Sequence, residues 1–128
     1  MVRYMIDEIL YILMRDDMDS LNPGKGMAQS AHASNIFMIA NIKDEGFRRW
    51  AGERGFGITI VLAANIEQIH AKYGLAKKSG FKTGLVRDTS YPLTDGDTLH
   101  LLDIVTCGYI FGNKEDLISI LGDLELYK

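Results

Sequence analysis

A lysine, a glutamine and a histidine follow one another at helical spacing soon after the first apolar segment of the chain. They are Lys25, Gln29 and His32, within the stretch 22–33, Asn-Pro-Gly-Lys-Gly-Met-Ala-Gln-Ser-Ala-His-Ala. A helix turns about 100° per residue, so positions i, i+4 and i+7 share one face. A lysine in the first helical turn is repelled by the partial positive charge of that helix end. Its presence there therefore predicts an anion or a carbonyl oxygen nearby. A solvated lysine, a surface glutamine and a packed histidine fit the same spacing.

The segments around this stretch predict alternating strands and helices. The apolar run 9–14 predicts a strand buried on both faces, residues 18–24 a loop, and residues 25–42 the helix that carries the three polar side chains. The later elements are predicted from β-branched runs, helical spacing and capping residues: strands at 57–63, 82–87 and 104–111, helices at 47–53, 66–79 and 114–122, a polar loop at 89–97, a short extended piece at 98–102 and an edge extension at 124–127. This alternation predicts a three-layer α/β domain with a mixed sheet.

Composition is that of a globular protein. The 128 residues, 47% of them apolar and 24% charged, predict one domain that spans residues 1–128. The apolar run 58–64 is too short to span a bilayer, and the acidic residues at the end of Met1–Glu8 do not fit a signal peptide. The single cysteine, Cys107, excludes an intrachain disulfide and a cysteine zinc site. We therefore expect a cytoplasmic protein that does not associate with membranes.

Charge is uneven along the chain. The net charge of −3 does not favour nucleic-acid binding, because phosphate contacts need lysine and arginine. Basic residues nevertheless cluster at 48–54 and 72–82, whereas acidic residues concentrate at 16–19, 95–103 and 115–125. A one-sided basic surface and a simply solvated one are both consistent with this pattern.

Several familiar motifs are missing. Residues 24–26, Gly-Lys-Gly, lack the lead-in and the following Ser or Thr of a phosphate-binding P-loop. The histidines His32, His70 and His100 show no metal-ligand spacing with one another or with Cys107, and there is no nucleophile elbow. We expect no metal ion and no cofactor.

Asp88 is a second candidate for chemistry. It ends the predicted strand 82–87, and ligands bind in α/β sheets outside the carboxyl ends of strands. If that strand and the first one are parallel neighbours, Asp88 and Lys25 converge. An aspartate that merely caps the turn after the strand fits the sequence equally well.

These residues together resemble the type II peptidyl-tRNA hydrolase family, the archaeal and eukaryotic type. The family's signature is a first strand ended by Arg and Asp, followed by Gly-Lys-x-x-Ala-Gln-x-x-His-Ala, and it is matched by Arg15-Asp16 and by residues 24–33. Segments 60–62, 76–80, 85–88 and 112–127 resemble later parts of the family in the same order. The resemblance implies a mixed four-stranded sheet with helices on both faces, a homodimer, and hydrolysis of the ester that joins a peptide to the 3′ end of tRNA, without a metal or cofactor.

The resemblance also implies roles for particular residues. Lys25 and Asp88 correspond to the catalytic pair, and Thr106 to the family's strand threonine. Lys25 would stabilise negative charge on the ester, Asp88 would hold the lysine or orient a water, and Thr106 would donate a hydrogen bond to water or carbonyl. The family's helix residues correspond to Gln29 and His32. Candidates for the tRNA backbone are the basic residues Arg48, Arg49, Lys77, Lys78, Lys82 and Arg87.

The chain departs from the family after Asp88. The family continues Ala-Gly-Arg-Thr-Gln-Ile-Ala-Pro-Gly, whereas residues 89–96 are Thr-Ser-Tyr-Pro-Leu-Thr-Asp-Gly, and the loop 89–103 is longer. Thr94 and Thr89 are both candidates for the missing loop threonine. The sequence therefore leaves two alternatives beside hydrolysis of peptidyl-tRNA: a non-catalytic binding or regulatory module, and an esterase for another acylated RNA.

Overall fold

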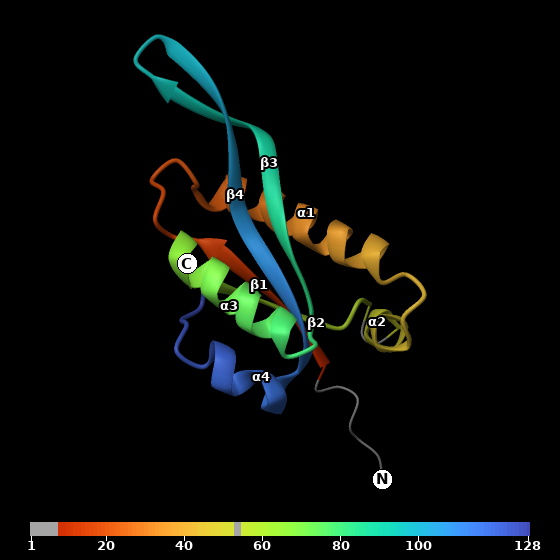
Figure 1. Ribbon diagram of the computed structural model, residues 1–128. Coiled ribbons are helices and arrows are strands. Elements are labelled where there is room, and N and C mark those ends of the chain that lie inside the picture. Colours follow the sequence, from red (N-terminus) through yellow and green to blue (C-terminus); the bar gives the residue numbers. More distant parts are fainter. Residues whose placement is uncertain (1–7, 53–54) are drawn as a thin grey trace.

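The computed structural model describes residues 8–52 and 55–128, in which strands and helices alternate (Figure 1). Most of Met1–Glu8, the stretch that does not fit a signal peptide, and the end of the predicted helical turn 47–53 lie outside the described residues. The bounds are β1 (Glu8–Arg15), α1 (Pro23–Ala40), α2 (Glu45–Ala51), β2 (Ile58–Ala64), α3 (Ile66–Lys78), β3 (Lys82–Asp95), β4 (Thr98–Asn113) and α4 (Lys114–Leu121). The described helices are not long and apolar enough to cross a membrane.

The strands form one mixed sheet in the order β2-β1-β4-β3. Strand β1 pairs in parallel with β2 and antiparallel with β4, and β3 pairs antiparallel with β4. Strand β1 is buried on both faces, which explains its unbroken apolar run. The predicted three-layer α/β fold with a mixed four-stranded sheet is confirmed.

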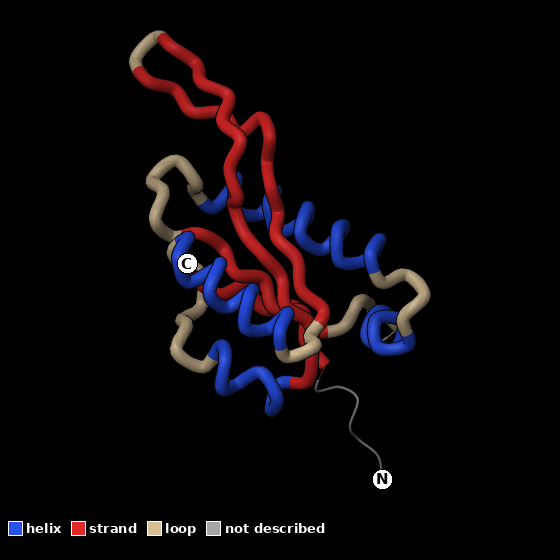
Figure 2. The backbone as a smooth tube through the Cα atoms, in the orientation of Figure 1, coloured by secondary structure: helices blue, strands red, loops and turns tan. Residues whose placement is uncertain are grey.

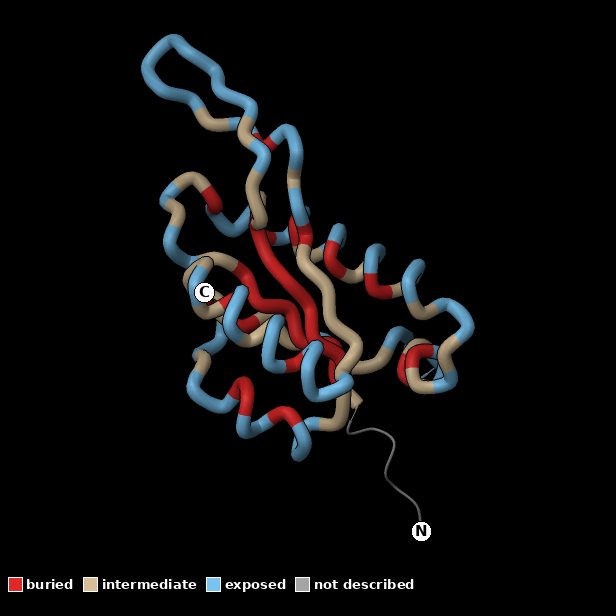
Figure 3. The backbone as a smooth tube through the Cα atoms, in the orientation of Figure 1, coloured by how far each residue is buried: buried red, intermediate tan, exposed pale blue. Residues whose placement is uncertain are grey.

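Helices cover both faces of this sheet (Figure 2). Side chains alternate along a strand, so Leu10, Ile12 and Met14 of β1 face α1 and α2 and pack in one core cluster with Phe37 and Trp50. The other face of β1, with Ile9, Tyr11 and Leu13, packs in a second cluster against α3 and α4. These helices contribute Ile69, Ala76, Leu117 and Ile120 to the cluster. The buried residues of the strands run through the centre of the molecule (Figure 3).

The polar segment 89–103 is not a loop. Strands β3 and β4 continue through it as a hairpin that projects beyond the helices, with Asp95 paired to Thr98 across a two-residue turn. Gly96 takes a φ of +62° in this turn, which favours glycine. The prediction of a loop at 89–97 was wrong because most of the segment is exposed, so its strands lack the apolar run that marks buried strands. The extended piece predicted at 98–102 is confirmed as the first part of β4.

The chain's end closes the other edge of the sheet. Leu126 pairs antiparallel with Leu62 of β2, and the amide of Tyr127 donates to the carbonyl of Val61 at 2.9 Å. The predicted edge extension at 124–127 is therefore present. Its last aromatic residue, Tyr127, reaches back with its hydroxyl and donates to the carbonyl of Leu21 at 3.2 Å, just before α1 begins.

Candidate active site

Local sequence places Lys25 in the first turn of α1. Asn22 caps the helix, its side chain accepting a hydrogen bond of 3.0 Å from the amide of Lys25, and Pro23 occupies the first turn, where a missing N–H costs nothing. Gly26 allows Tyr127 to lie close, because a Cβ there would meet the tyrosine hydroxyl at 3.0 Å. The helix start is thus held from both the loop before it and the chain's end.

Two groups of the hairpin hold the Lys25 side chain. Its Nζ donates to the carbonyl of Pro92 at 3.3 Å and lies 4.8 Å from the centroid of the Tyr91 ring. The carbonyl oxygen that the sequence predicts beside this lysine is thus the one of Pro92. Tyr91 is buried, and its hydroxyl shares a hydrogen bond of 3.0 Å with Ser20. The residues that replace the family's loop therefore determine where this ammonium group lies.

The contact between Lys25 and Tyr91 leads to a prediction that can be tested in solution. The Hε protons of Lys25 should be shifted upfield by the Tyr91 ring, because they lie beside its face. The shift should persist in Tyr91→Phe, which loses only the hydroxyl bond to Ser20, and disappear in Tyr91→Leu. Lysine-selective proton–carbon NMR measures it, and an unshifted wild-type resonance would contradict the contact.

Asp88 meets Gln29 and not Lys25. Its Oδ2 accepts a hydrogen bond of 3.0 Å from Gln29 Nε2, and its Oδ1 accepts one of 2.9 Å from the amide of Ser90. Strand β4 lies between β1 and β3, so the strands that precede Lys25 and Asp88 are not neighbours. Lys25 and Asp88 form no ion pair, but Asp88 contacts Gln29, which lies one turn after Lys25 on α1. The arrangement of parallel neighbours considered from the sequence does not occur.

Gln29 connects Asp88 to Thr106. Thr106 is fully buried and its Oγ1 donates to Gln29 Oε1 at 2.7 Å, while Gln29 itself is only 6% exposed. A carboxylate only accepts hydrogen bonds, so the amide nitrogen must face Asp88 and the amide oxygen must take the hydroxyl proton. Thr106 therefore acts on Gln29, and its single proton is not directed at solvent. The sequence pointed to Gln29 through its helical spacing, but did not reveal this bridging position.

A hollow of about 350 Å³ opens beside this chain of hydrogen bonds, between α1 and β3. Its lining is Gln29, His32, Asn35, Ile36, Ile39, Val86, Arg87, Asp88 and Thr89. Of the two candidate loop threonines, Thr89 lines this hollow, whereas Thr94 pairs with Leu99 in the exposed part of the hairpin. A register shift between Asp88 and Tyr91 sets Thr89 and Ser90 out of the regular pairing at this point.

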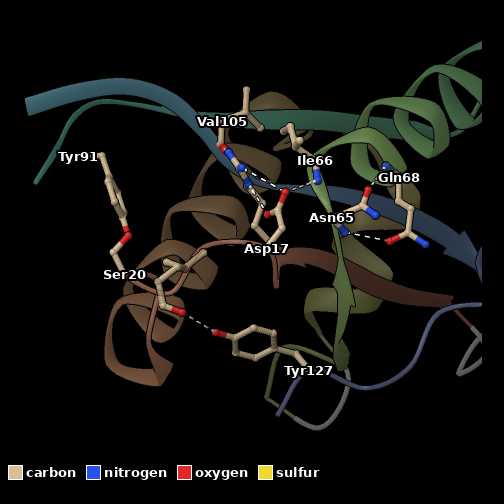
Figure 4. A network of polar contacts seen from close by, with 10 residues as sticks. Asp17, Ser20, Asn65, Ile66, Gln68, Tyr91, Val105 and Tyr127 are labelled. Atoms are coloured by element: carbon tan, nitrogen blue, oxygen red, sulfur yellow. Dashed lines mark hydrogen bonds and ion pairs between the residues drawn. The ribbon is translucent and has the colours of Figure 1, made fainter. Parts of the chain in front are cut away.

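A separate polar network fastens the loop before α1 (Figure 4). Arg15 contacts both oxygens of Asp17, at 2.8 and 3.2 Å, and also donates to the carbonyl of Val105 at 3.1 Å. Asp17 in turn accepts from the amide of Ile66 at 3.1 Å. Burial alone would raise the pKa of Asp17, but these hydrogen bonds outweigh it and hold the pKa below its usual value. The strand end that carries Arg15 is thus tied to the residue preceding Thr106.

The six basic residues expected to contact a tRNA backbone differ in their interactions and exposure. Three of them form ion pairs: Arg49 with Glu8 at 2.7 Å, Lys82 with Asp44 at 3.1 Å and Arg87 with Asp103 at 2.6 Å. Lys77 lies over the ring of Tyr73, at 5.5 Å from its centroid. Arg48 and Lys78 are exposed. The structure does not gather the six into one patch at the hollow, and only Arg87 lines it.

Cys107 follows Thr106 in β4 and lies against the backbone of Gln29. It is buried, its Sγ is 3.5 Å from the backbone oxygen of Gln29, and burial raises the pKa of its thiol to about 12. We expect native protein to resist thiol reagents at pH 8 and to react once unfolded in denaturant, because only the thiolate attacks. Labelling followed by mass spectrometry measures this. Rapid labelling of native protein would contradict the packing described here.

The same pKa difference has a consequence for stability. An unfolded cysteine titrates near ~8.5, so between that pH and about 12 the unfolded chain loses its thiol proton while the folded chain keeps it. The stability that this neutral thiol contributes is complete below pH ~8.5 and declines as the pH rises through this window.

The fold and this site define a three-layer α/β domain with a hydrogen-bonded polar centre between a helix and an edge strand. The chain belongs to the family of peptidyl-tRNA hydrolase PTH2, whose sequence model matches residues 9–127. No curated protein matches the chain. Among solved structures, it is similar to a protein of unknown function from Agrobacterium tumefaciens, with 14% identity, 95% of this chain and 98% of that chain covered, and a TM-score of 0.59. At this identity the likeness shows the fold alone.

Proposed function

We propose that this protein hydrolyses the ester bond of peptidyl-tRNA and releases free tRNA and peptide. The family match over residues 9–127 supports this class of reaction. The single observation that carries it at the level of the site is the bridge of Gln29 between Thr106 and Asp88, at 2.7 and 3.0 Å, one helical turn from Lys25. It brings the motif on α1 and the aspartate on β3 to one place.

The proposed chemistry needs a water and a cation. Asp88 orients a water and takes its proton as the oxygen attacks the ester carbonyl, and Gln29 keeps the carboxylate in position. The ammonium of Lys25 has three donors, of which one contacts Pro92, so others can stabilise the developing oxyanion. The carbonyl carbon then loses the 3′ oxygen of the tRNA, which recovers the proton. Thr89, on the rim of the hollow, is the loop threonine placed to contact the substrate.

Substrate binding and assembly belong to the same proposal. Gln29 and His32 line the hollow. The exposed Lys78 is offered to tRNA phosphates, and Arg87 joins it if a phosphate replaces its exposed partner Asp103. Contacts of this kind add affinity without sequence readout. We further propose a cytoplasmic homodimer, as the family resemblance implies. Exposed apolar side chains near α2, Ile42 and Phe56, are available for such a contact. Thr94, two residues beyond the Pro92 carbonyl that Lys25 contacts, is the second threonine of the hairpin offered to the substrate.

One observation favours a second function. Lys25 and Asp88 are not ion-paired, since Lys25 is held by the hairpin and Asp88 by Gln29 and Ser90. A scaffold that keeps these groups apart could bind an acylated RNA, peptidyl-tRNA or another, without hydrolysing it. This alternative predicts binding of the substrate with no turnover.

The deciding experiment measures release of free tRNA from purified N-acetyl-aminoacyl-tRNA, with the ester's spontaneous hydrolysis as the blank. Turnover above the blank by folded protein supports the proposed function. Saturable binding without release supports the scaffold alternative, and absence of both contradicts each of them.

A further inference from the structure

The hollow between α1 and β3 is lined by side chains of different chemistry. Gln29 and Asp88, which form the polar centre, are among them. Ile36 and Ile39, further along α1, and Val86 of β3 are aliphatic. Ile36 and Ile39 are 40% and 79% exposed, although apolar side chains of a surface helix normally face the core. We call this hollow, with its nine lining residues, the α1–β3 pocket.

The pocket's position restricts what can enter it. Asp88 and Gln29 belong both to the pocket and to the proposed reacting centre, so a group in the pocket lies next to the attacked ester carbonyl. That carbonyl connects two groups: the Cα of the esterified amino acid, which carries the side chain and the rest of the peptide, and the terminal ribose of the tRNA. The occupant is therefore part of the acyl group or part of the terminal nucleoside.

The lining favours the acyl group. Proteins hold unpaired bases by stacking on aromatic rings or on an arginine plane. The pocket's lining residues include no Phe, Tyr or Trp, and their one aromatic ring is the imidazole of the exposed His32. The only arginine there, Arg87, is engaged with both carboxylate oxygens of Asp103, at 2.6 and 2.8 Å. Asp88 repels a phosphate at the same place, since like charges disfavour each other. A neutral aliphatic group has none of these difficulties.

We propose that the α1–β3 pocket binds an aliphatic side chain of the amino acid esterified to tRNA, and so makes this protein selective among peptidyl-tRNAs by their last residue. This inference rests on the proposed function. At about 350 Å³ the pocket is at the small end of the range for ligand sites, ~300–1,000 Å³, which suits one side chain. Because the pocket is partly open, we expect selectivity near the lower limit for an apolar pocket, about tenfold in kcat/KM for leucyl over glycyl substrates.

The test uses one tRNA acylated with N-acetyl-leucine, N-acetyl-glycine or N-acetyl-aspartate, so that only the side chain differs. Wild-type protein should prefer the leucyl ester about tenfold over the glycyl ester and reject the aspartyl ester most strongly. Ile36→Asp should reduce the leucyl-to-glycyl ratio towards one. Ile118→Asp, at an isoleucine of α4 that is 64% exposed on the other side of the sheet, is the matched control and should retain the wild-type ratio.

Three results would overturn the proposal. One is equal kcat/KM for the leucyl and glycyl esters with wild-type protein. The second is a folded Ile36→Asp variant that keeps both the wild-type ratio and the wild-type kcat/KM. The third is an equal loss for all three esters in Ile36→Asp, which would place the terminal adenosine in the pocket.

A binding measurement separates this proposal from the proposed function. If no ester is hydrolysed, the proposed function fails, and the pocket is judged with non-hydrolysable 3′-amide analogues of N-acetyl-leucyl- and N-acetyl-glycyl-adenosine. Isoleucine methyl NMR should then show the signal of Ile36 moving more with the leucyl than with the glycyl analogue. Equal shifts, or none, would overturn the pocket's assignment.

Discussion

Lys25→Ala is expected to lower kcat for release of tRNA from peptidyl-tRNA by ~10²–10³-fold while the protein stays folded. A loss in kcat of this size is expected when one charged donor to the developing oxyanion is removed. The fold should persist because the cap made by Asn22 uses the backbone amide of residue 25, which alanine retains. The side chain's own contacts, with Pro92 and the ring of Tyr91, are partly exposed and contribute about 1 kcal/mol or less. Single-turnover release assays and thermal unfolding measure the two parts.

Two further variants make this result specific. Lys43→Ala removes the same charge at an exposed position beyond the other end of α1 and should leave turnover unchanged. Lys25→Arg keeps the charge but replaces a compact ammonium by a planar fork, so it should recover only part of the activity. Wild-type turnover in a folded Lys25→Ala variant would remove this residue from the mechanism.

Asp88→Asn should have the second largest effect, a loss of ~10²-fold or more in kcat, because the carboxylate is the proposed proton acceptor. The asparagine oxygen can still accept from Gln29 or from the amide of Ser90, but not from both, so its NH₂ group must face one donor. The geometry of Gln29 should therefore loosen as well. A steady-state assay measures kcat, and the side-chain amide signal of Gln29 in NMR reports the hydrogen bond directly.

Asp95→Asn is the appropriate control for Asp88→Asn. It makes the same chemical change at an exposed aspartate beside the hairpin turn, away from the α1–β3 pocket, and should leave kcat unchanged. Full activity of Asp88→Asn would show that another group accepts the proton. Equal losses in both variants would contradict a specific role of Asp88, because removing a negative charge cannot by itself weaken binding of the negatively charged tRNA.

Much of the fold follows from local patterns in the sequence. The buried strand β1 and the helices α1 and α3 lie within a few residues of their predicted positions, because each has a period or a cap that local chemistry determines. The capping box at the start of α3 is an example, with Asn65 and Gln68 exchanging hydrogen bonds of 2.8 and 2.9 Å. The hairpin was missed because its strands stabilise each other through pairing, and the partner of Leu93, His100, cannot be inferred from a local pattern.

Local sequence was enough to predict the family, the helix that carries Lys25, Gln29 and His32, and the alternation that makes an α/β sheet. Which of these groups meet depends on the tertiary arrangement. Strand β4 lies between β1 and β3, so Asp88 contacts Gln29 and not Lys25. Thr106 of β4 contacts the side-chain oxygen of the same glutamine. The position of the Lys25 ammonium depends on Tyr91, which is far from it in sequence. The spacing along one helix shows which side chains share a face. Strand order and register depend on how the whole sheet is buried, and no short stretch of sequence contains that information.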